Sequence, residues 1–278
     1  MSPIITVGIK AARRAGSIIL RYLDRLDQLS VEKKGRNDFV SEVDRMAEED
    51  IIDTIHYLYP NHQILAEESG TQFSPDLDKP DHERNSLDEQ DVEWIIDPLD
   101  GTTNYLHGHP HFCVSIAARI KGRIEHAIIF DPLRDEIYTA SRGQGAQLNS
   151  RRIRVSGQAK LENSLVSTGY PTRNMTHYDP WMSSLRSVLP RVSNIRYSGS
   201  AALDLAYVAS GRTDGYWEPG LAIWDIAAGS LLVREAGGLV SDFKGGQDYL
   251  QSGHIVAGNQ RLFNQLLSTV KSRTGTLG

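Results

Sequence analysis

The chain has 278 residues, of which 40% are hydrophobic and 23% charged, and its formal net charge is −5. This composition excludes a chain that is disordered throughout, because it holds enough apolar residues for a sizeable core. No apolar run approaches the length that crosses a bilayer, so we expect no membrane segment. The acidic balance disfavours broad electrostatic binding to nucleic acid.

The chain begins without a signal-peptide pattern, and Cys113 is its single cysteine. We therefore expect a cytoplasmic protein without an internal disulfide. Apolar residues recur every three or four positions from Ile4 to Tyr22 and from Val43 to Leu58, which predicts two amphipathic helices. The polar segment between them, Lys33 to Asp38, predicts a loop or turn.

The middle of the chain favours strands. Gln63 to Ala66 and Trp94 to Ile96 are short strand candidates, and the apolar runs from Cys113 to Thr139 predict an antiparallel meander. Thr71 to Gln90 is polar and holds two prolines, which is typical of a mobile surface insertion. Arg151 to Arg154 is a short basic run that we interpret as a solvated strand edge.

The last third alternates between strands and helices. Strands are predicted at 166–168, 195–197, 215–217, 239–241 and 255–257, and helices at 201–209, 224–236 and 260–270. The order predicts an α/β fold, more narrowly α+β, in which sheets and helices form layers. We expect one continuous unit in two parts, an α+β part at 1–160 and an α/β part at 161–278.

The segment from Trp94 to Asn104 carries the chemistry. An apolar strand ends at Asp97, Pro98 is expected to stop the strand, and Gly101 allows a tight turn into a short helix. Asp97 and Asp100 then converge beside backbone N–H groups that can bind an anion. Two carboxylates this close repel each other unless a cation lies between them, and oxygen ligands suit Mg²⁺ or Mn²⁺. The pattern indicates hydrolysis of a phosphate ester, although Asp-Pro or Asp-Gly alone is an ordinary turn.

Two other acidic segments complete a candidate metal cluster. Glu67 and Glu68 follow the strand from Gln63, and Asp225 opens a helix. Taken singly, the two glutamates are typical of a solvated turn and Asp225 of an acid favoured by the helix dipole.

These motifs resemble the inositol monophosphatase family, and within it the bacterial SuhB-type branch. The strings that carry the resemblance are Asn37 to Val40 with Asp44, Glu67 to Ser69, Trp94 to Asn104, Gly143 to Ala146, Gly199 to Asp204, Trp224 to Gly229 and Glu235 to Gly238. The resemblance implies an α-β-α-β-α sandwich of mixed sheets and helices. It also implies a lithium-sensitive, Mg²⁺-dependent phosphatase that forms a homodimer. In this one continuous catalytic unit, residues 1–160 are expected to bind metal and phosphate, and residues 161–278 to contribute Asp225 and the contacts to the substrate ring.

The resemblance also implies roles for single residues. Its metal ligands, for two or three Mg²⁺ per site, are Glu67, Asp97, the Leu99 carbonyl, Asp100 and Asp225. Its catalytic residues are Thr102, Asp44 and Glu67, of which Thr102 and Asp44 activate the attacking water. Its substrate-binding residues are Glu67, Leu99, Asp100, Gly101, Thr102, Gly199, Ser200, Ala201, Glu218 and Asp225. Either Lys33 or Lys34 takes the position of the family's active-site lysine.

Three hypotheses for the function follow from the resemblance. The first is hydrolysis of inositol monophosphate and related small polyol phosphates. The second is hydrolysis of histidinol phosphate or of a 3′-phosphoadenosine nucleotide. The third is a binding role with the transcription and ribosomal RNA machinery, through surface residues such as Arg151 to Arg154.

Overall fold

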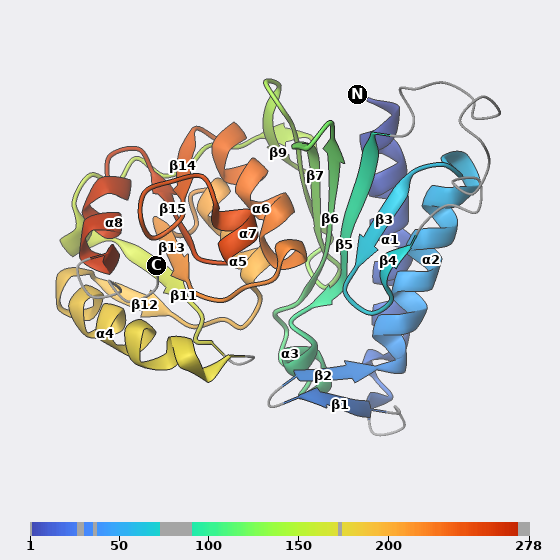
Figure 1. The fold of residues 1–278 in the computed structure, drawn as a ribbon, viewed down its shortest axis with the longest axis horizontal. Helices are drawn as coiled ribbons and strands as arrows, with labels where there is room; N and C mark the ends of the chain where they lie inside the picture. Colours follow the sequence, from blue (N-terminus) through green and yellow to red (C-terminus); the bar gives the residue numbers. More distant parts are fainter. Residues whose placement is uncertain (1, 27–30, 36–37, 73–90, 172–173, 272–278) are drawn as a thin grey trace.

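Helices and sheets alternate in layers through the computed structural model, which describes residues 2–26, 31–35, 38–72, 91–171 and 174–271. Figure 1 shows two helices against one face of an eight-stranded sheet, further helices between that sheet and a five-stranded sheet, and a last pair of helices beyond it. This is the predicted α-β-α-β-α sandwich. Within the described residues, no helix is both long and apolar enough to traverse a bilayer.

The first layer consists of α1 (Pro3–Leu23) and α2 (Glu42–Leu58), as the apolar spacing predicts. Their apolar stripes pack with one face of the large sheet in a common core. The Ser41 side chain caps α2 by accepting a hydrogen bond from the Val43 N–H at 3.2 Å. This cap fixes the helix register directly before Asp44.

The large sheet combines one parallel strand pair with an antiparallel meander that follows it in the chain. Its strands are β3 (Gln63–Ala66), β4 (Gly70–Gln72), β5 (Val92–Asp100), β6 (Cys113–Ile120), β7 (Arg123–Asp131), β8 (Glu136–Ser141), β9 (Gly145–Leu148) and β10 (Arg151–Arg152), in the order β10-β9-β8-β7-β6-β5-β3-β4. Only β3 and β5 pair in parallel among these strands. Trp94 and Ile96 face the α1–α2 core and Ile95 faces the opposite core, so β5 is buried on both sides.

The small sheet lies between two helical layers. Its strands are β11 (Leu165–Thr168), β12 (Asn194–Arg196), β13 (Gly215–Glu218), β14 (Gly238–Ser241) and β15 (Ile255–Asn259), in the order β12-β11-β13-β15-β14. The helices are α5 (Ala201–Ala209), α6 (Ile223–Glu235) and α7 (Tyr249–Ser252) between the sheets, and α4 (Tyr178–Val188) and α8 (Phe263–Lys271) on the outer side. A Cβ on Gly229 would lie 2.5 Å from Leu205 Cβ, so this glycine lets α5 and α6 approach closely.

The loop or turn predicted at Lys33 to Asp38 is wrong for the residues that the structure describes there, which lie in strands. The backbone forms a hairpin of β1 (Val31–Gly35) and β2 (Asp38–Ser41), in which Glu32 pairs with Val40. A two-stranded ribbon needs little apolar sequence, so a polar segment can form it. Residues 36–37 and the side chains of Lys33 and Lys34 lie outside the described part of the chain, so the lysine prediction stays open.

Other sequence predictions differ at their edges. The insertion predicted at Thr71 to Gln90 starts too early, because Thr71 belongs to β4 and pairs with Leu65 of β3. Residues 73–90 lie outside the described residues. The strand expected at 195–197 lies one residue earlier, as β12. The exposed pair Arg151–Arg152 forms the edge strand β10, as expected.

Candidate active site

Strand β5 does not end at Pro98. Asp97 pairs with Ser115, the register then shifts, and Asp100 pairs with Cys113. The predicted stop is wrong because the irregularity accommodates a residue without an N–H, and the strand resumes beyond it. The same irregularity lets Asp97 and Asp100 from one strand share a site.

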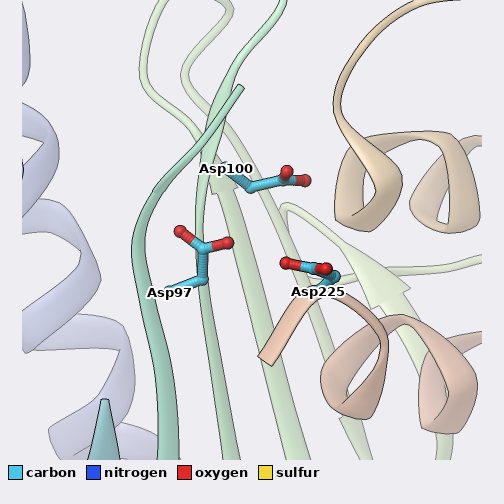
Figure 2. A group of neighbouring side chains, drawn as sticks. All are labelled: Asp97, Asp100 and Asp225. Atoms are coloured by element: carbon cyan, nitrogen blue, oxygen red, sulfur yellow. The ribbon is translucent and has the colours of Figure 1, made fainter. Parts of the chain in front are cut away.

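Three aspartates from distant parts of the chain meet at this irregularity. Asp97, Asp100 and Asp225 each offer a carboxylate oxygen within 4.8 Å of the other two. Figure 2 shows Asp97 and Asp100 extending from β5 and Asp225 from the first turn of α6, with their carboxylates directed toward one another. Their exposed fractions are only 1%, 9% and 4%. Buried like charges at this spacing repel, and the all-oxygen donor set fits a hard cation such as Mg²⁺.

Backbone groups orient two of these carboxylates. Asp97 Oδ1 accepts the Leu99 N–H at 3.0 Å. Asp225 Oδ2 accepts the Ala222 N–H at 2.7 Å, at the beginning of α6. An acid in the first turn of a helix is favoured by the free N–H groups there. Both carboxylates are therefore fixed by groups within three residues of themselves.

Asp100 is held from the other part of the chain. Its Oδ2 accepts the Ser200 hydroxyl and the Ala202 N–H, both at 2.7 Å. Ser200 also accepts a hydrogen bond from the Leu203 N–H and so caps α5. Sequence reasoning missed this contact, because 100 positions separate the two side chains.

Thr102 and Asp44 lie together, as the resemblance implies. Thr102 Oγ1 is 2.9 Å from Asp44 Oδ1 and 3.0 Å from the Leu99 carbonyl oxygen, and its single proton serves one acceptor at a time. Asp44 is 1% exposed. Burial raises the pKa of Asp44, and hydrogen bonds from Ser41 and Thr102 partly offset that effect.

Gly101 makes the turn between β5 and α3 (Thr102–Leu106) in a left-handed conformation, with φ at +98°. A Cβ at this position would lie 3.0 Å from the His111 carbonyl oxygen. The turn therefore needs glycine for both its φ and its space. The short helix after Gly101 matches the sequence prediction.

All the predicted site residues except Asp44 line one cavity of about 430 Å³. Its walls include Glu67, Asp97, Leu99, Asp100, Gly101, Thr102, Gly199, Ser200, Ala201, Glu218 and Asp225. Glu67 follows β3, and its N–H donates to the Ile96 carbonyl oxygen at 3.1 Å. Asp44 contacts the cavity through Thr102.

Glu218 is a partly buried acid of the substrate-binding set, at the end of β13. The Tyr216 hydroxyl donates to its Oε2, and a Cβ on Gly169 would collide with its carboxylate. Burial raises the pKa of Glu218 well above its usual value, and the charges of Asp225 and Asp204 add to this effect.

Several cavity residues had no assigned role in the sequence analysis. Asn104 donates from its side chain to the carbonyls of His111 and Ser198, at 2.7 and 2.8 Å, which joins α3 to the loop before α5. Tyr170 and Tyr197 also line the cavity, with ring centroids 5.2 Å apart. The spacing of Tyr170 and Tyr197 in the sequence gives no sign that they line a site. Asn104, by contrast, is the last residue of the Trp94 to Asn104 motif, and this position could have identified it as a site residue.

Comparison with known proteins identifies the family of this chain. Residues 1–274 match the model of the inositol monophosphatase family. The chain belongs to that family. The family resemblance predicted from the motifs is thereby confirmed, and it supports a phosphatase of this superfamily.

The similarity of this inositol monophosphatase family member to its relatives extends over nearly all of each chain. It is 50% identical to the Nus factor SuhB of Pseudomonas aeruginosa, over 98% of this chain and 97% of that protein. The SuhB structure from Bartonella henselae is 42% identical, with a TM-score of 0.90 over 97% of this chain and 99% of that one. The IMPase structure from Thermotoga maritima is 33% identical, with a TM-score of 0.85 over 100% of both chains.

Proposed function

We propose that this protein is a Mg²⁺-dependent phosphatase that hydrolyses inositol monophosphate and related small polyol phosphates to the polyol and phosphate. The observation that carries the proposal is the meeting of Asp97, Asp100 and Asp225 within 4.8 Å in a buried site. Such a cluster is strongly unfavourable without cations and favourable with them. The family match supports the phosphatase chemistry.

The proposed ligands divide between two ion positions. Glu67, Asp97 and the Leu99 carbonyl oxygen would hold the first Mg²⁺, and Asp97, Asp100 and Asp225 the second, with a third ion as the alternative count. Bound Mg²⁺ supplies Lewis acidity and lowers the pKa of water. The chain itself contributes the fixed carboxylates that set the spacing between the ions.

The remaining residues orient the reacting groups. When the Thr102 hydroxyl donates its hydrogen bond to Asp44 Oδ1, 2.9 Å away, the Thr102 oxygen is free to accept a hydrogen bond from the attacking water. Glu67 is the third group proposed to act on that water. The N–H groups of Gly101 and Thr102 are proposed to bind the phosphoryl oxygens as the leaving group departs.

Recognition of the polyol is assigned to cavity residues from the C-terminal part of the chain. Gly199, Ser200 and Ala201 precede or begin α5, and Glu218 ends β13. A carboxyl group can bond two neighbouring hydroxyls, which suits a polyol ring. The alternative substrates are histidinol phosphate and a 3′-phosphoadenosine nucleotide, and a panel of phosphomonoesters separates them.

The test measures phosphate release from that panel, with and without Mg²⁺. Wild type is expected to prefer inositol monophosphate and to require Mg²⁺. The isosteric Asp97→Asn variant is expected to keep the fold and lose at least about 100-fold in turnover, as loss of a direct ligand costs no less than loss of its supporting contacts. The exposed Asp91→Asn serves as the matched control. Wild-type turnover by Asp97→Asn at saturating Mg²⁺ contradicts the ligand assignment.

A second candidate function is binding to the transcription machinery. The 50% identical relative from Pseudomonas aeruginosa is named a Nus factor, and so is a 48% identical relative from Escherichia coli. Arg151, Arg152 and Arg154 are exposed on this chain and offer a basic contact. In a pull-down with purified transcription proteins, binding is expected to survive Asp97→Asn and to weaken when the three arginines become alanine. Loss of binding in Asp97→Asn alone contradicts an independent binding role.

Three further properties belong to the same proposal through the family resemblance. They are inhibition by lithium, assembly as a homodimer and a cytoplasmic location.

A further inference from the structure

Helix α2 carries a second buried carboxylate, Glu48, one turn after Asp44. Glu48 is only 2% exposed. Its Oε2 accepts the Glu68 N–H and its Oε1 accepts the Ser69 N–H, both at 2.8 Å. The two carboxylate oxygens of Glu48 therefore accept hydrogen bonds from the two backbone N–H groups that directly follow Glu67.

The turn that Glu48 binds connects β3 to β4 in the large sheet. The turn consists of residues 67–69, and β4 begins after it at Gly70. At its first residue, the Glu67 N–H donates a hydrogen bond to the Ile96 carbonyl oxygen at 3.1 Å. The N–H groups of Glu68 and Ser69 point away from the strand ladder, and Glu48 supplies their acceptors. Charged acceptors make such bonds short and strong.

The two carboxylates of α2 support two different loops. Residues four apart lie on the same face of a helix, so Asp44 and Glu48 project in the same direction. Asp44 contacts Thr102 after β5, and Glu48 contacts the turn after β3. One rigid helix therefore sets the distance between these two loops, which both line the cavity.

We propose that Glu48 is a positioning residue that holds Glu67 in place to bind Mg²⁺, an inference that rests on the proposed phosphatase function. A ligand whose backbone is fixed on both sides loses less conformational entropy when it binds the ion. Asp44 acts on the other loop, through Thr102. Loss of Glu48 is therefore expected to weaken the metal site, and loss of Asp44 to slow the chemistry.

The experiment compares Mg²⁺ binding by calorimetry, in the absence of substrate, for wild type, Glu48→Gln and Glu49→Gln. Glutamine keeps the size of Glu48 but replaces one acceptor with an NH₂ group that faces a backbone N–H. We expect Mg²⁺ affinity to fall by roughly 10- to 100-fold in Glu48→Gln. Turnover is expected to recover to within a few-fold of wild type at high Mg²⁺. Glu49 is exposed on the same helix, and its variant should bind Mg²⁺ as wild type does.

Two further measurements separate positioning from general stability. Hydrogen exchange at the Glu68 and Ser69 amides should accelerate in Glu48→Gln while the rest of α2 stays protected. Asp44→Asn should keep its Mg²⁺ affinity and lose turnover at every Mg²⁺ concentration. If Glu48→Gln does not fold, Glu48→Asp, which keeps the charge on a shorter side chain, is expected to show the same loss of affinity.

A folded Glu48 variant with wild-type Mg²⁺ affinity overturns the inference. Failure of the proposed function gives a different result, because wild type itself would then neither bind Mg²⁺ at this site nor release phosphate.

Discussion

His62 links the stability of the protein to pH through one buried ring. It is 3% exposed, and its ring stacks on that of Tyr59 with the ring centroids 4.4 Å apart. Its Nδ1 accepts a hydrogen bond from the Trp94 indole N–H at 2.9 Å. Burial lowers the pKa of His62 to about 4. The unfolded chain, with a histidine pKa near about 6.5, therefore binds more protons than the folded chain between these two values.

This difference predicts a loss of stability in acid. The contribution of neutral His62 is complete above about pH 6.5 and declines toward pH 4, by at most about 1.4 kcal/mol per pH unit. His111 and His254, whose pKa values are also lowered to about 4, act in the same direction. His62→Gln should thus be less stable at pH 7.5 and depend less on pH than wild type. Urea unfolding at pH 7.5 and 5 measures this, and equal pH dependence of both proteins contradicts it.

The sequence predicts some site residues better than others for a physical reason. Asp97 and Asp100 follow an apolar strand and flank turn residues, a context that marks them locally. Glu48 is the first of three consecutive acids, Glu48 to Asp50, in a helix with other acids, so the sequence alone does not single it out. Only its partners, 20 and 21 residues away, distinguish it. The contact between Ser200 and Asp100 could not be predicted for the same reason, because the two residues are 100 positions apart in the sequence.

At the scale of elements, a strand that is buried on both faces can be predicted from its continuous apolar sequence, whereas its ends depend on pairing with other strands. The apolar run at 94–96 predicts β5, and the structure buries it between two cores. The extension of β5 past Pro98 depends on its pairing with β6, which no local rule contains. The β1–β2 hairpin was missed because strand pairing, rather than an apolar pattern, defines it.

Helix α6 shows the same principle. It lies between the two sheets, and most of its residues are buried, so its apolar residues surround the axis rather than forming a stripe. Its first turn still contains Asp225, which points to the cavity between these layers. Because the helix lies in the middle layer, Asp225 lies close to Asp97 and Asp100 of β5.

At the scale of the whole molecule, the site requires both sheets and the helices between them. Asp97 and Asp100 come from the large sheet, Asp225 from the middle layer and Glu218 from the small sheet. The motifs predicted which residues meet, but the layer order that brings them together rests on non-local packing. The division at 1–160 and 161–278 stays a prediction.

The most direct test of the shared cation site is a calorimetric Mg²⁺ titration of wild type and Asp225→Asn, with the exposed Asp179→Asn as control. Asp225 is far in sequence from the β5 aspartates, so it can affect Mg²⁺ binding only if the folded chain joins them. Wild type and Asp179→Asn should bind Mg²⁺ alike, and folded Asp225→Asn should bind fewer ions or bind at least about tenfold more weakly. Unchanged stoichiometry and affinity in Asp225→Asn would contradict a shared cation site.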